Sequence, residues 1–346
     1  MELRPCGTTG LRLSVLGIGC WEFGGSDYWG PQSQAEADAV VRRALDLGVN
    51  YFDVAESYND GRSEECLGRA IKGLGRDRLA IGTKVSPANT APATLVEHCE
   101  ASLRRLGTDY IDLYMIHWPI TPRNVPPGAP VPAAADAFAA LRRLREQGKV
   151  RHVGVSNFGV VAMAEALGLG VAPAANQLCY SLLSRAIEFE VLPFCRAHGV
   201  GVIAYLALMQ GLLTGKYRTL DEVPPLHRRT RHFDGRQSGT LCRHGEPGAE
   251  AEVNAALAAI REIGRESGLS MSDLAIKWAI AQPGMACVLA GCRTPQRVEE
   301  NARATAAPLA PEIASRLSAA TDVLKAKLGR NCDYWEAAAN DRTRSA

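Results

Sequence analysis

The sequence predicts an α/β fold, a (β/α)8 barrel of the TIM type with an N-terminal β-hairpin cap and long loops at its C-terminal face. Eight short apolar runs, each followed by a segment with helical periodicity, are the first observation. The second is size, since 346 residues with 47% hydrophobic side chains can bury a large core. We expect one domain over residues 1–346, with a C-terminal helix and tail at about 311–346 over the barrel.

The apolar runs are the predicted buried strands. Their ranges are Val15 to Gly19, Asn50 to Val54, Leu79 to Lys84, Ile111 to Ile116, Val150 to Val155, Ala174 to Leu178, Val200 to Tyr205 and Ala286 to Ala290. A strand and helix rhythm repeated in this way gives a parallel sheet covered by helices, and right-handed crossovers let that sheet close. An open, doubly wound sheet is the alternative.

Helical periodicity is clearest in four segments between the strands, Glu36 to Leu47, Leu95 to Leu106, Ala135 to Gln147 and Glu250 to Glu266. Ser33 precedes the first segment, and Glu36 follows three residues later. This is a capping-box pattern, in which each side chain satisfies the other residue's backbone N–H. A further helix is expected beyond Ala310.

Three segments lie outside this rhythm. Leu3 to Leu13 is predicted to form two short strands around a glycine-rich turn, a hairpin lid on the larger fold. Pro119 to Pro132 and Pro224 to Glu250 are predicted to be surface loops. The second loop is long enough to be functional rather than a plain connector.

Charge and cysteine content exclude several classes of partner. The chain has 39 Lys and Arg against 37 Asp and Glu, so no overall field favours nucleic acid or a membrane surface. Its ten cysteines include no C-x-x-C pair, which is typical of reduced thiols in the cytoplasm. No apolar run approaches the length of a membrane span, and the N-terminus lacks a signal-peptide pattern. We expect a soluble cytoplasmic protein with a small-molecule partner; its oligomeric state cannot be read from the sequence.

Two glycine-rich segments resemble phosphate-binding motifs but depart from them. After Gly17 and Gly19, the third glycine of a dinucleotide fingerprint would fall at Glu22. Gly211 to Lys216 is one residue short of a phosphate loop, and Tyr217 stands where Ser or Thr would bind magnesium. Neither segment is therefore interpreted as a nucleotide motif.

One loop holds four potential zinc ligands, His227, His232, Cys242 and His244. Their spacing matches no standard zinc pattern. A solvated basic loop is the simpler interpretation, and no metal is expected.

Polar residues at the carboxyl ends of parallel strands meet at one rim of a barrel. Asp53 closes the second predicted strand, and Tyr58 follows in the next loop. Lys84 ends the third strand, and His117 ends the fourth. Taken singly, each residue also has a purely structural interpretation. Asp53 could cap a helix, Tyr58 could be an aromatic residue of a loop, Lys84 could extend its charge to solvent, and His117 could be a hydrogen-bonded histidine of the core.

Together the four residues suggest acid–base chemistry. A buried Lys lowers the pKa of a neighbouring phenol, and an Asp beside that Lys keeps it charged. Tyr58 would then be a usable general acid near neutral pH. His117 could donate a hydrogen bond to a carbonyl oxygen as negative charge develops there.

Six stretches resemble the signatures of the aldo-keto reductase family. They are FDVAESYNDGRSEECLG (Phe52 to Gly68), IGTK (Ile81 to Lys84), DLYMIHWP (Asp112 to Pro119), GVSNF (Gly154 to Phe158), AYLALMQGLLTGKY (Ala204 to Tyr217) and GCRTPQRVEEN (Gly291 to Asn301). They follow the family's order, and the chain is most similar to the bacterial branch that is like potassium-channel subunits. The resemblance implies a catalytic tetrad of Asp53, Tyr58, Lys84 and His117. Tyr58 would donate a proton in reduction and accept one in oxidation.

The resemblance also implies a nicotinamide cofactor. Ser156, Asn157 and Gln177 would hold its carboxamide, Tyr205 would stack on the ring, and Cys20, Trp21 and Asp53 would contact it. Leu206, Ala207, Leu208, Gln210, Gly211 and Lys216 would line the diphosphate, and Gly291, Cys292, Arg293, Arg297, Glu300 and Asn301 the adenosine end. Arg297 stands where a basic side chain often meets the 2′-phosphate. Because guanidinium groups suit phosphate, NADPH/NADP+ is favoured over NAD(H).

The chain departs from the family pattern at two places. Leu206 and Ala207 replace a common Ser-Pro pair, which removes a hydroxyl contact near the diphosphate. Cys292 stands where many members carry a small hydroxyl residue or alanine. Neither change touches the four catalytic candidates.

Aromatic residues are predicted to form the substrate pocket, namely Trp21, Tyr28, Trp29 and Trp118 with His117. Parts of the loops after Pro119 and Pro224 should complete the pocket, and Trp335 could join it from the tail. Aromatic walls suit an apolar or ring-shaped carbonyl compound, although tryptophans fill cores equally well.

Three functions fit the sequence. The first is an NADP(H)-dependent reductase of an aldehyde or ketone. The second is a sugar or polyol dehydrogenase that runs the same site in the oxidative direction. The third is a cofactor-sensing regulatory subunit, against which the intact set of four catalytic candidates argues.

Overall fold

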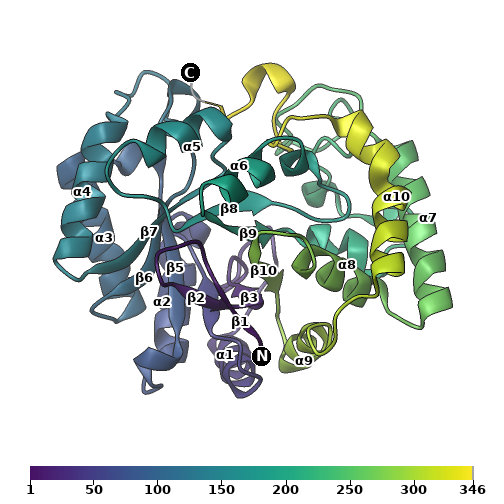
Figure 1. The fold of residues 1–346 in the computed structure, drawn as a ribbon, viewed down its shortest axis with the longest axis horizontal. Coiled ribbons are helices and arrows are strands. Elements are labelled where there is room, and N and C mark those ends of the chain that lie inside the picture. Colours follow the sequence, from purple (N-terminus) through teal and green to yellow (C-terminus); the bar gives the residue numbers. More distant parts are fainter. Residues whose placement is uncertain (345–346) are drawn as a thin grey trace.

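Eight parallel strands close into a barrel in the computed structural model, which describes residues 1–344 (Figure 1). The strands are β3 (Leu16–Gly19), β4 (Tyr51–Asp53), β5 (Ala80–Val85), β6 (Ile111–Ile116), β7 (Val150–Ser156), β8 (Ala175–Cys179), β9 (Gly201–Tyr205) and β10 (Met285–Gly291). They follow one another around the barrel in chain order, and β10 pairs with β3 from Val288 and Leu16 to Gly291 and Gly19. The predicted barrel is confirmed, and the doubly wound alternative is wrong because the sheet has no open edge. Each predicted strand differs from the observed one by at most one residue at either end.

Helices cover the outside of the barrel. They are α1 (Gln34–Asp46), α2 (Arg62–Ile71), α3 (Pro92–Leu106), α4 (Ala134–Glu146), α5 (Val160–Leu167), α6 (Val191–Ala197), α7 (Glu250–Ser267), α8 (Met271–Ile280), α9 (Pro295–Arg303) and α10 (Pro311–Leu328). The capping box of Ser33 and Glu36 is confirmed at α1. Helix α3 begins at Pro92 rather than at the predicted Leu95. Proline is tolerated in the first turn because a backbone N–H there would have no helical partner, so its missing N–H costs nothing.

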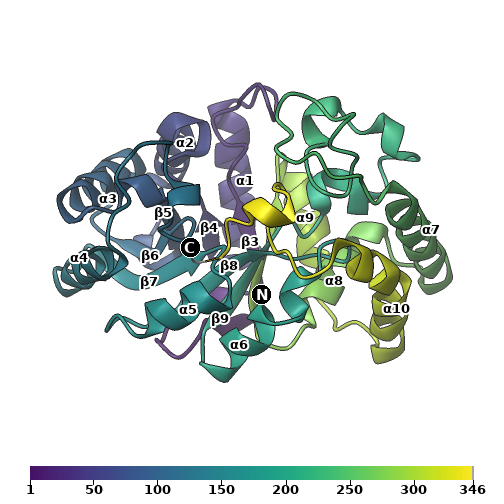
Figure 2. The same ribbon diagram turned by 90° about the horizontal axis from the view of Figure 1, so that it is seen from above.

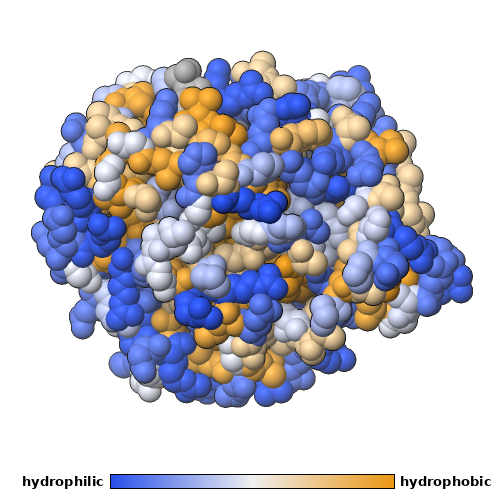
Figure 3. All heavy atoms as spheres, in the orientation of Figure 1, coloured by the Kyte–Doolittle hydropathy of each residue, from blue (hydrophilic) through white to orange (hydrophobic). Residues whose placement is uncertain are grey.

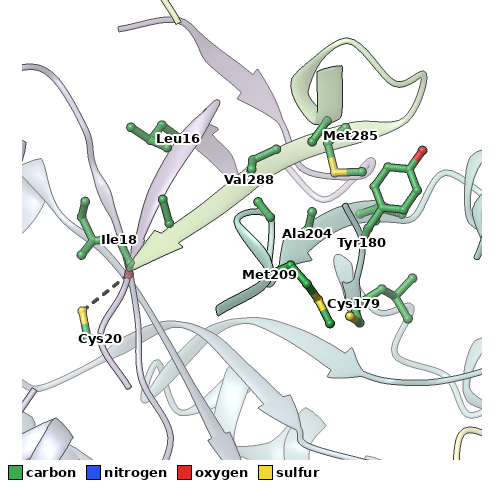
Figure 4. Packing of buried hydrophobic residues seen from close by; sticks show 14 of the residues in the cluster. Leu16, Ile18, Cys20, Cys179, Tyr180, Ala204, Met209, Met285 and Val288 are labelled. Atoms are coloured by element: carbon green, nitrogen blue, oxygen red, sulfur yellow. Dashed lines mark hydrogen bonds between the residues drawn. The ribbon is translucent and has the colours of Figure 1, made fainter. Parts of the chain in front are cut away.

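The main apolar core lies between the strands and these helices. Figure 4 shows part of it, where Leu16, Ala204 and Val288 come from the neighbouring strands β3, β9 and β10. Burial of a side chain the size of Leu16 or Val288 contributes roughly 1.5–3 kcal/mol to stability. This core fixes the strands whose carboxyl ends carry the polar residues.

A hairpin closes the amino-terminal end of the barrel, as predicted. Strands β1 (Leu3–Pro5) and β2 (Arg12–Ser14) pair antiparallel, and Leu13 packs into the cluster that fills the barrel interior. Gly7 in its turn has φ +66°, and a Cβ there would lie 2.6 Å from the carbonyl oxygen of Ala174. With this end closed, a ligand is left only the opposite end of the barrel.

The segment after α10 crosses the carboxyl ends of the strands (Figure 2). It is held by a hydrogen bond from the Ala186 backbone N–H to the Tyr334 hydroxyl at 2.8 Å, and by one from Gly159 N–H to Thr343 O at 2.8 Å. Residues 345–346 of the predicted tail lie outside the described part of the chain. The assignment of residues 1–346 to one domain stays a prediction.

The two predicted loops are confirmed, since they contain the short 3-10 helices Pro122–Asn124 and Pro225–His227 and otherwise irregular chain. Hydrophilic and hydrophobic side chains are interspersed over the face seen in Figure 3. Within residues 1–344, no helix combines the length and the apolar character needed to cross a bilayer.

Candidate active site

Asp53 and Lys84 form a buried ion pair at the carboxyl ends of β4 and β5. The Lys84 Nζ lies 2.6 Å from Asp53 Oδ1 and 2.7 Å from the carbonyl oxygen of Val54. Lys84 is 0% exposed and Asp53 is 2% exposed. Burial lowers the pKa of Lys84, but Asp53 and Tyr58 together raise it more, so the net direction is upward. Lys84 therefore keeps its positive charge, as the sequence predicted.

The second carboxylate oxygen of Asp53 is also occupied. It accepts hydrogen bonds from the Tyr51 hydroxyl at 3.1 Å and from Gln177 Nε2 at 2.6 Å. Buried charges need such partners, because an unpaired one is strongly destabilising. Asp53 is thus fixed by groups from three strands, β4, β5 and β8.

The Tyr58 hydroxyl lies 3.3 Å from the same Lys84 Nζ. The chain turns back over the rim here, with Asn59 and Asp60 at φ 52° and 56° in the left-handed region that Asn and Asp tolerate. The Asn59 side-chain amide holds this turn, because it donates to the carbonyl oxygens of Trp21 and Phe23 at 2.9 Å each.

Burial raises the pKa of Tyr58 by more than the Lys84 ammonium lowers it. The expectation of a lowered phenol pKa is therefore wrong in its net direction. Lys84 acts with the predicted sign, but the sequence could not show how far the phenol is removed from water. Tyr58 is protonated at neutral pH and retains a proton to donate.

His117 follows β6 and stands edge-on to the Tyr58 ring, with ring centroids 5.7 Å apart. Burial, with the nearby Lys84 and Arg342 cations, lowers the pKa of His117 well below its ordinary value. Its imidazole is therefore neutral near pH 7 and keeps one ring N–H for donation. Tyr58 and His117 thus present two neutral donors from adjacent positions.

A chain of hydrogen bonds links the predicted carboxamide-binding residues to His117. Tyr205 OH donates to Asn157 Oδ1 at 2.6 Å, and Asn157 Nδ2 donates to the His117 carbonyl oxygen at 3.0 Å. Ser156 Oγ donates to the Gln177 carbonyl oxygen at 3.0 Å. These contacts set the position of the amide and phenol groups before any ligand binds.

One cavity of about 930 Å³ brings most of the predicted residues together. Its predicted cofactor residues are Cys20, Trp21, Asp53, Ser156, Asn157, Gln177, Tyr205, Leu206, Ala207, Leu208, Gln210, Gly211, Lys216, Gly291, Arg293 and Arg297. Tyr58, Trp29, His117 and Trp118 line it as well. Five predicted residues are not among those that line it, namely Tyr28, Lys84, Cys292, Glu300 and Asn301.

Several lining residues were missed by the sequence analysis: Glu22, Arg229, Leu241, Arg243 and Arg342. Glu22 could have been found, because it closely follows the first barrel strand and is polar. The others come from the long loop and the tail. The loop after Pro224 was expected at the pocket, but no local sequence signal shows which residues of the loop or the tail reach it. Trp335, suggested from the tail, does line the cavity.

The chain around Gly211, with the ammonium group of Lys216, suits an anionic diphosphate. Leu206, Met209 and Gln210 have φ of 57°, 44° and 52°, a strained backbone of the kind that persists at functional sites. Gly211 has φ +97°, and a Cβ there would overlap Lys216 Cε, so a larger residue would be strained and would displace this lysine. The Lys216 Nζ lies 4.5 Å from the Tyr217 ring centre, and none of the ion pairs within residues 1–344 involves it.

The far end of the cavity is lined by two arginines. Arg293 donates to the carbonyl oxygens of Trp29, at 2.6 Å, and Pro31. Arg297 forms an ion pair with Glu300 at 2.5 Å. Nearby, Asn301 Oδ1 is buried with no hydrogen-bond partner.

Aromatic rings wall the near end. Trp21 stacks on Tyr28 at 5.4 Å and on Tyr58 at 5.6 Å, and Trp118 meets Trp335 edge to face at 6.3 Å. The Arg342 guanidinium lies 4.0 Å above the Trp118 ring.

Two of the four potential zinc ligands of the long loop contact backbone carbonyl oxygens through their rings. His232 contacts the Leu183 carbonyl oxygen at 2.7 Å, and His227 contacts the Tyr28 carbonyl oxygen at 3.2 Å. Over residues 1–344, no three His, Cys, Asp or Glu side chains gather as metal ligands would.

The chain is similar to known proteins over most of its length. It matches the model of the Aldo/keto reductase family over residues 15–322. It is 32% identical over 324 residues to the NADH-specific methylglyoxal reductase of Escherichia coli K12, which covers 88% of this chain and 93% of that protein. A putative voltage-gated potassium channel subunit beta of Schizosaccharomyces pombe is 29% identical over 336 residues, 92% of each chain. The crystal structure of a thermostable aldo-keto reductase with the inhibitor epalrestat superposes with a TM-score of 0.73 at 27% identity, covering 92% of this chain and 100% of that one. The chain therefore belongs to the aldo-keto reductase family.

Proposed function

We propose that the protein is an NADP(H)-dependent oxidoreductase that reduces an aldehyde or ketone to an alcohol. The contact of one buried cation, Lys84, with both Asp53 and Tyr58 carries this proposal. A phenol that lines a large cavity and touches a buried cation behind it suits a proton donor that must lose and regain its proton.

When bound, the nicotinamide cofactor would supply the hydride, and the protein would supply orientation and the proton. Tyr58 would donate its phenolic proton to the carbonyl oxygen of the substrate. Lys84 would stabilise the phenolate left behind, and Asp53 would keep Lys84 charged. The neutral His117 would donate a hydrogen bond to the same oxygen as negative charge develops there.

The same groups support oxidation of an alcohol, in which the Tyr58 phenolate would accept the proton. A sugar or polyol dehydrogenase thus remains the second candidate for this site. The two neutral donors of this site, Tyr58 and His117, both suit a carbonyl oxygen as the bound group. We therefore propose that the site runs in the direction of reduction.

We infer a preference for NADP(H) from the two arginines at the far end of the cavity. A guanidinium group can meet a phosphate with two parallel hydrogen bonds. Arg297 would exchange its partner Glu300 for that phosphate. The Escherichia coli relative is named as NADH-specific, so the preference must be measured on this chain.

Fluorescence titration with NADPH and NADH tests binding, because Trp21 lines the cavity beside Tyr58. Turnover is then followed as carbonyl-dependent loss of NADPH, first with methylglyoxal, the substrate in the relative's name, and then with aromatic and sugar aldehydes. Saturable binding with NADPH preferred, followed by turnover, is expected. If neither cofactor binds, the proposal is wrong; tight binding without turnover of any carbonyl or alcohol would favour a cofactor-sensing subunit.

A further inference from the structure

A carboxyl group that the mechanism above does not use lies in the wall of the cofactor cavity. Glu22 follows β3 in the loop that leads to α1, and it is only 6% exposed. A Cβ built on Gly291 would lie 3.0 Å from Glu22 Oε1 and 3.2 Å from Oε2. The carboxyl group is therefore packed against the end of β10, inside the cavity rather than in solvent.

Few groups compensate a charge at this position. The Glu22 carboxyl group accepts hydrogen bonds from its own backbone N–H and from that of Cys292. Arg293 is the cation that faces it, but the guanidinium hydrogen-bonds to the carbonyl oxygens of Trp29 and Pro31. The thiols of Cys20 and Cys292 also face it, and both are neutral because burial raises the pKa of each far above 9.

Burial raises the pKa of Glu22 to about 7, against the lowering by the two backbone N–H groups and Arg293. The carboxyl group is thus close to half protonated at neutral pH. In this range a modest change in its surroundings changes its charge.

We propose that Glu22 is a further cofactor-contacting residue, whose carboxyl group faces the bound dinucleotide and takes up a proton when the dinucleotide binds. The inference rests on the proposed function, because it needs a dinucleotide in this cavity. The diphosphate that Lys216 would face is anionic, and an anion nearby disfavours an ionised carboxylate. A protonated carboxyl group is neutral and can also donate a hydrogen bond to a phosphate or ribose oxygen.

The direction of the pH dependence follows from linkage. If the complex raises the pKa of Glu22, the bound state holds more protons than the free state at neutral pH. Affinity is then greatest below pH 7, falls as the pH rises through the pKa of the free protein, and levels off above the pKa of the complex. Each unit by which binding raises that pKa weakens binding by about tenfold across this range.

The experiment compares dissociation constants of NADH and NADPH for the wild type and Glu22→Gln from about pH 6 to about pH 9. The wild type should lose about tenfold in affinity, and the variant should stay nearly level. The difference between the two proteins cancels any titration of the ligand itself. Glu97→Gln is the matched control, because it removes an exposed carboxylate on α3 and should keep the wild-type profile.

Calorimetry of the wild type in two buffers with different ionisation enthalpies gives an independent readout, uptake of part of a proton near pH 7.5. Parallel pH profiles in wild type and Glu22→Gln, or no proton uptake by the wild type, would overturn the inference. If Glu22→Gln fails to fold by circular dichroism, the proton uptake of the wild type decides alone. If neither dinucleotide binds the wild type at all, the proposed function fails. This outcome differs from binding whose affinity does not change with pH, which overturns only the inference about Glu22.

Discussion

The Lys84 Nζ bridges two groups of opposite character, Asp53 Oδ1 at 2.6 Å and Tyr58 OH at 3.3 Å. The carboxylate holds the charge on the lysine, and the lysine holds the phenol where it can lose a proton. Removal of the Tyr58 hydroxyl should therefore affect turnover alone, whereas breaking the pair of Asp53 and Lys84 should also lower stability.

Tyr58→Phe should bind NADPH as the wild type does while turnover falls by roughly 100- to 10,000-fold, because only the transferable proton is lost. Fluorescence titration measures binding, and steady-state loss of NADPH measures kcat. Tyr110→Phe is the control. The Tyr110 hydroxyl lies 3.5 Å from the Arg76 carbonyl oxygen, and Tyr110 does not line the cavity. Turnover unchanged in Tyr58→Phe would remove Tyr58 from the mechanism.

Lys84→Met should lower the free energy of unfolding by about 3–5 kcal/mol, because it leaves Asp53 charged, buried and without its cation. The double variant Asp53→Asn with Lys84→Met should be less destabilised than the sum of the two single variants. Urea denaturation of all four proteins gives this coupling. Additive losses would mean that the pair contributes no direct interaction to stability.

The strands and the four catalytic candidates were predictable because their signals are local. Buried runs such as Ile111 to Ile116 are read directly from apolar residues, and fold geometry then brings the carboxyl ends of these strands together. The partnership of Lys84 with Asp53 follows from neighbouring strands in parallel register, which the order of the chain already specifies.

The pKa of Tyr58 and the cavity residues of the tail could not be predicted. They depend on burial and on the path of the chain, neither of which leaves a local signal in the sequence. The net rise in the pKa of Tyr58 depends on how much water the cavity walls exclude. Arg342 reaches Trp118 because the tail is pinned by its two hydrogen bonds to Asp333, at 2.7 and 2.9 Å. Such a return path of the chain is a tertiary property, so the sequence suggested Trp335 but not Arg342.

His232 should make the fold less stable as the pH falls. Its ring is 0% exposed, and burial lowers its pKa from 6.5 to about 4. Below pH 6.5 the unfolded chain takes up a proton that the folded chain refuses, so stability is lost progressively down to about pH 4. This one group should contribute a loss of about 2 kcal/mol between about pH 7 and about pH 5.

Urea denaturation at the two pH values measures this loss, and His232→Gln should show a smaller pH dependence than the wild type. His198→Gln is the control, because that histidine is exposed and should leave the wild-type dependence intact. Equal pH dependence in all three proteins would show that His232 is not the group that resists protonation.

Arg297→Ala should weaken NADPH binding by roughly 10- to 100-fold and leave NADH binding within about threefold of the wild type, because only NADPH carries the 2′-phosphate. Fluorescence titration with both cofactors measures the two changes. Arg303→Ala, in the last turn of the same helix α9, is the control and should change neither. Glu300→Gln should act in the opposite direction, since it releases Arg297 from its ion pair at 2.5 Å and leaves the guanidinium free for phosphate. Equal losses for NADPH and NADH in Arg297→Ala would instead place this side chain against a part that the two cofactors share, and the preference for NADP(H) would have to be abandoned.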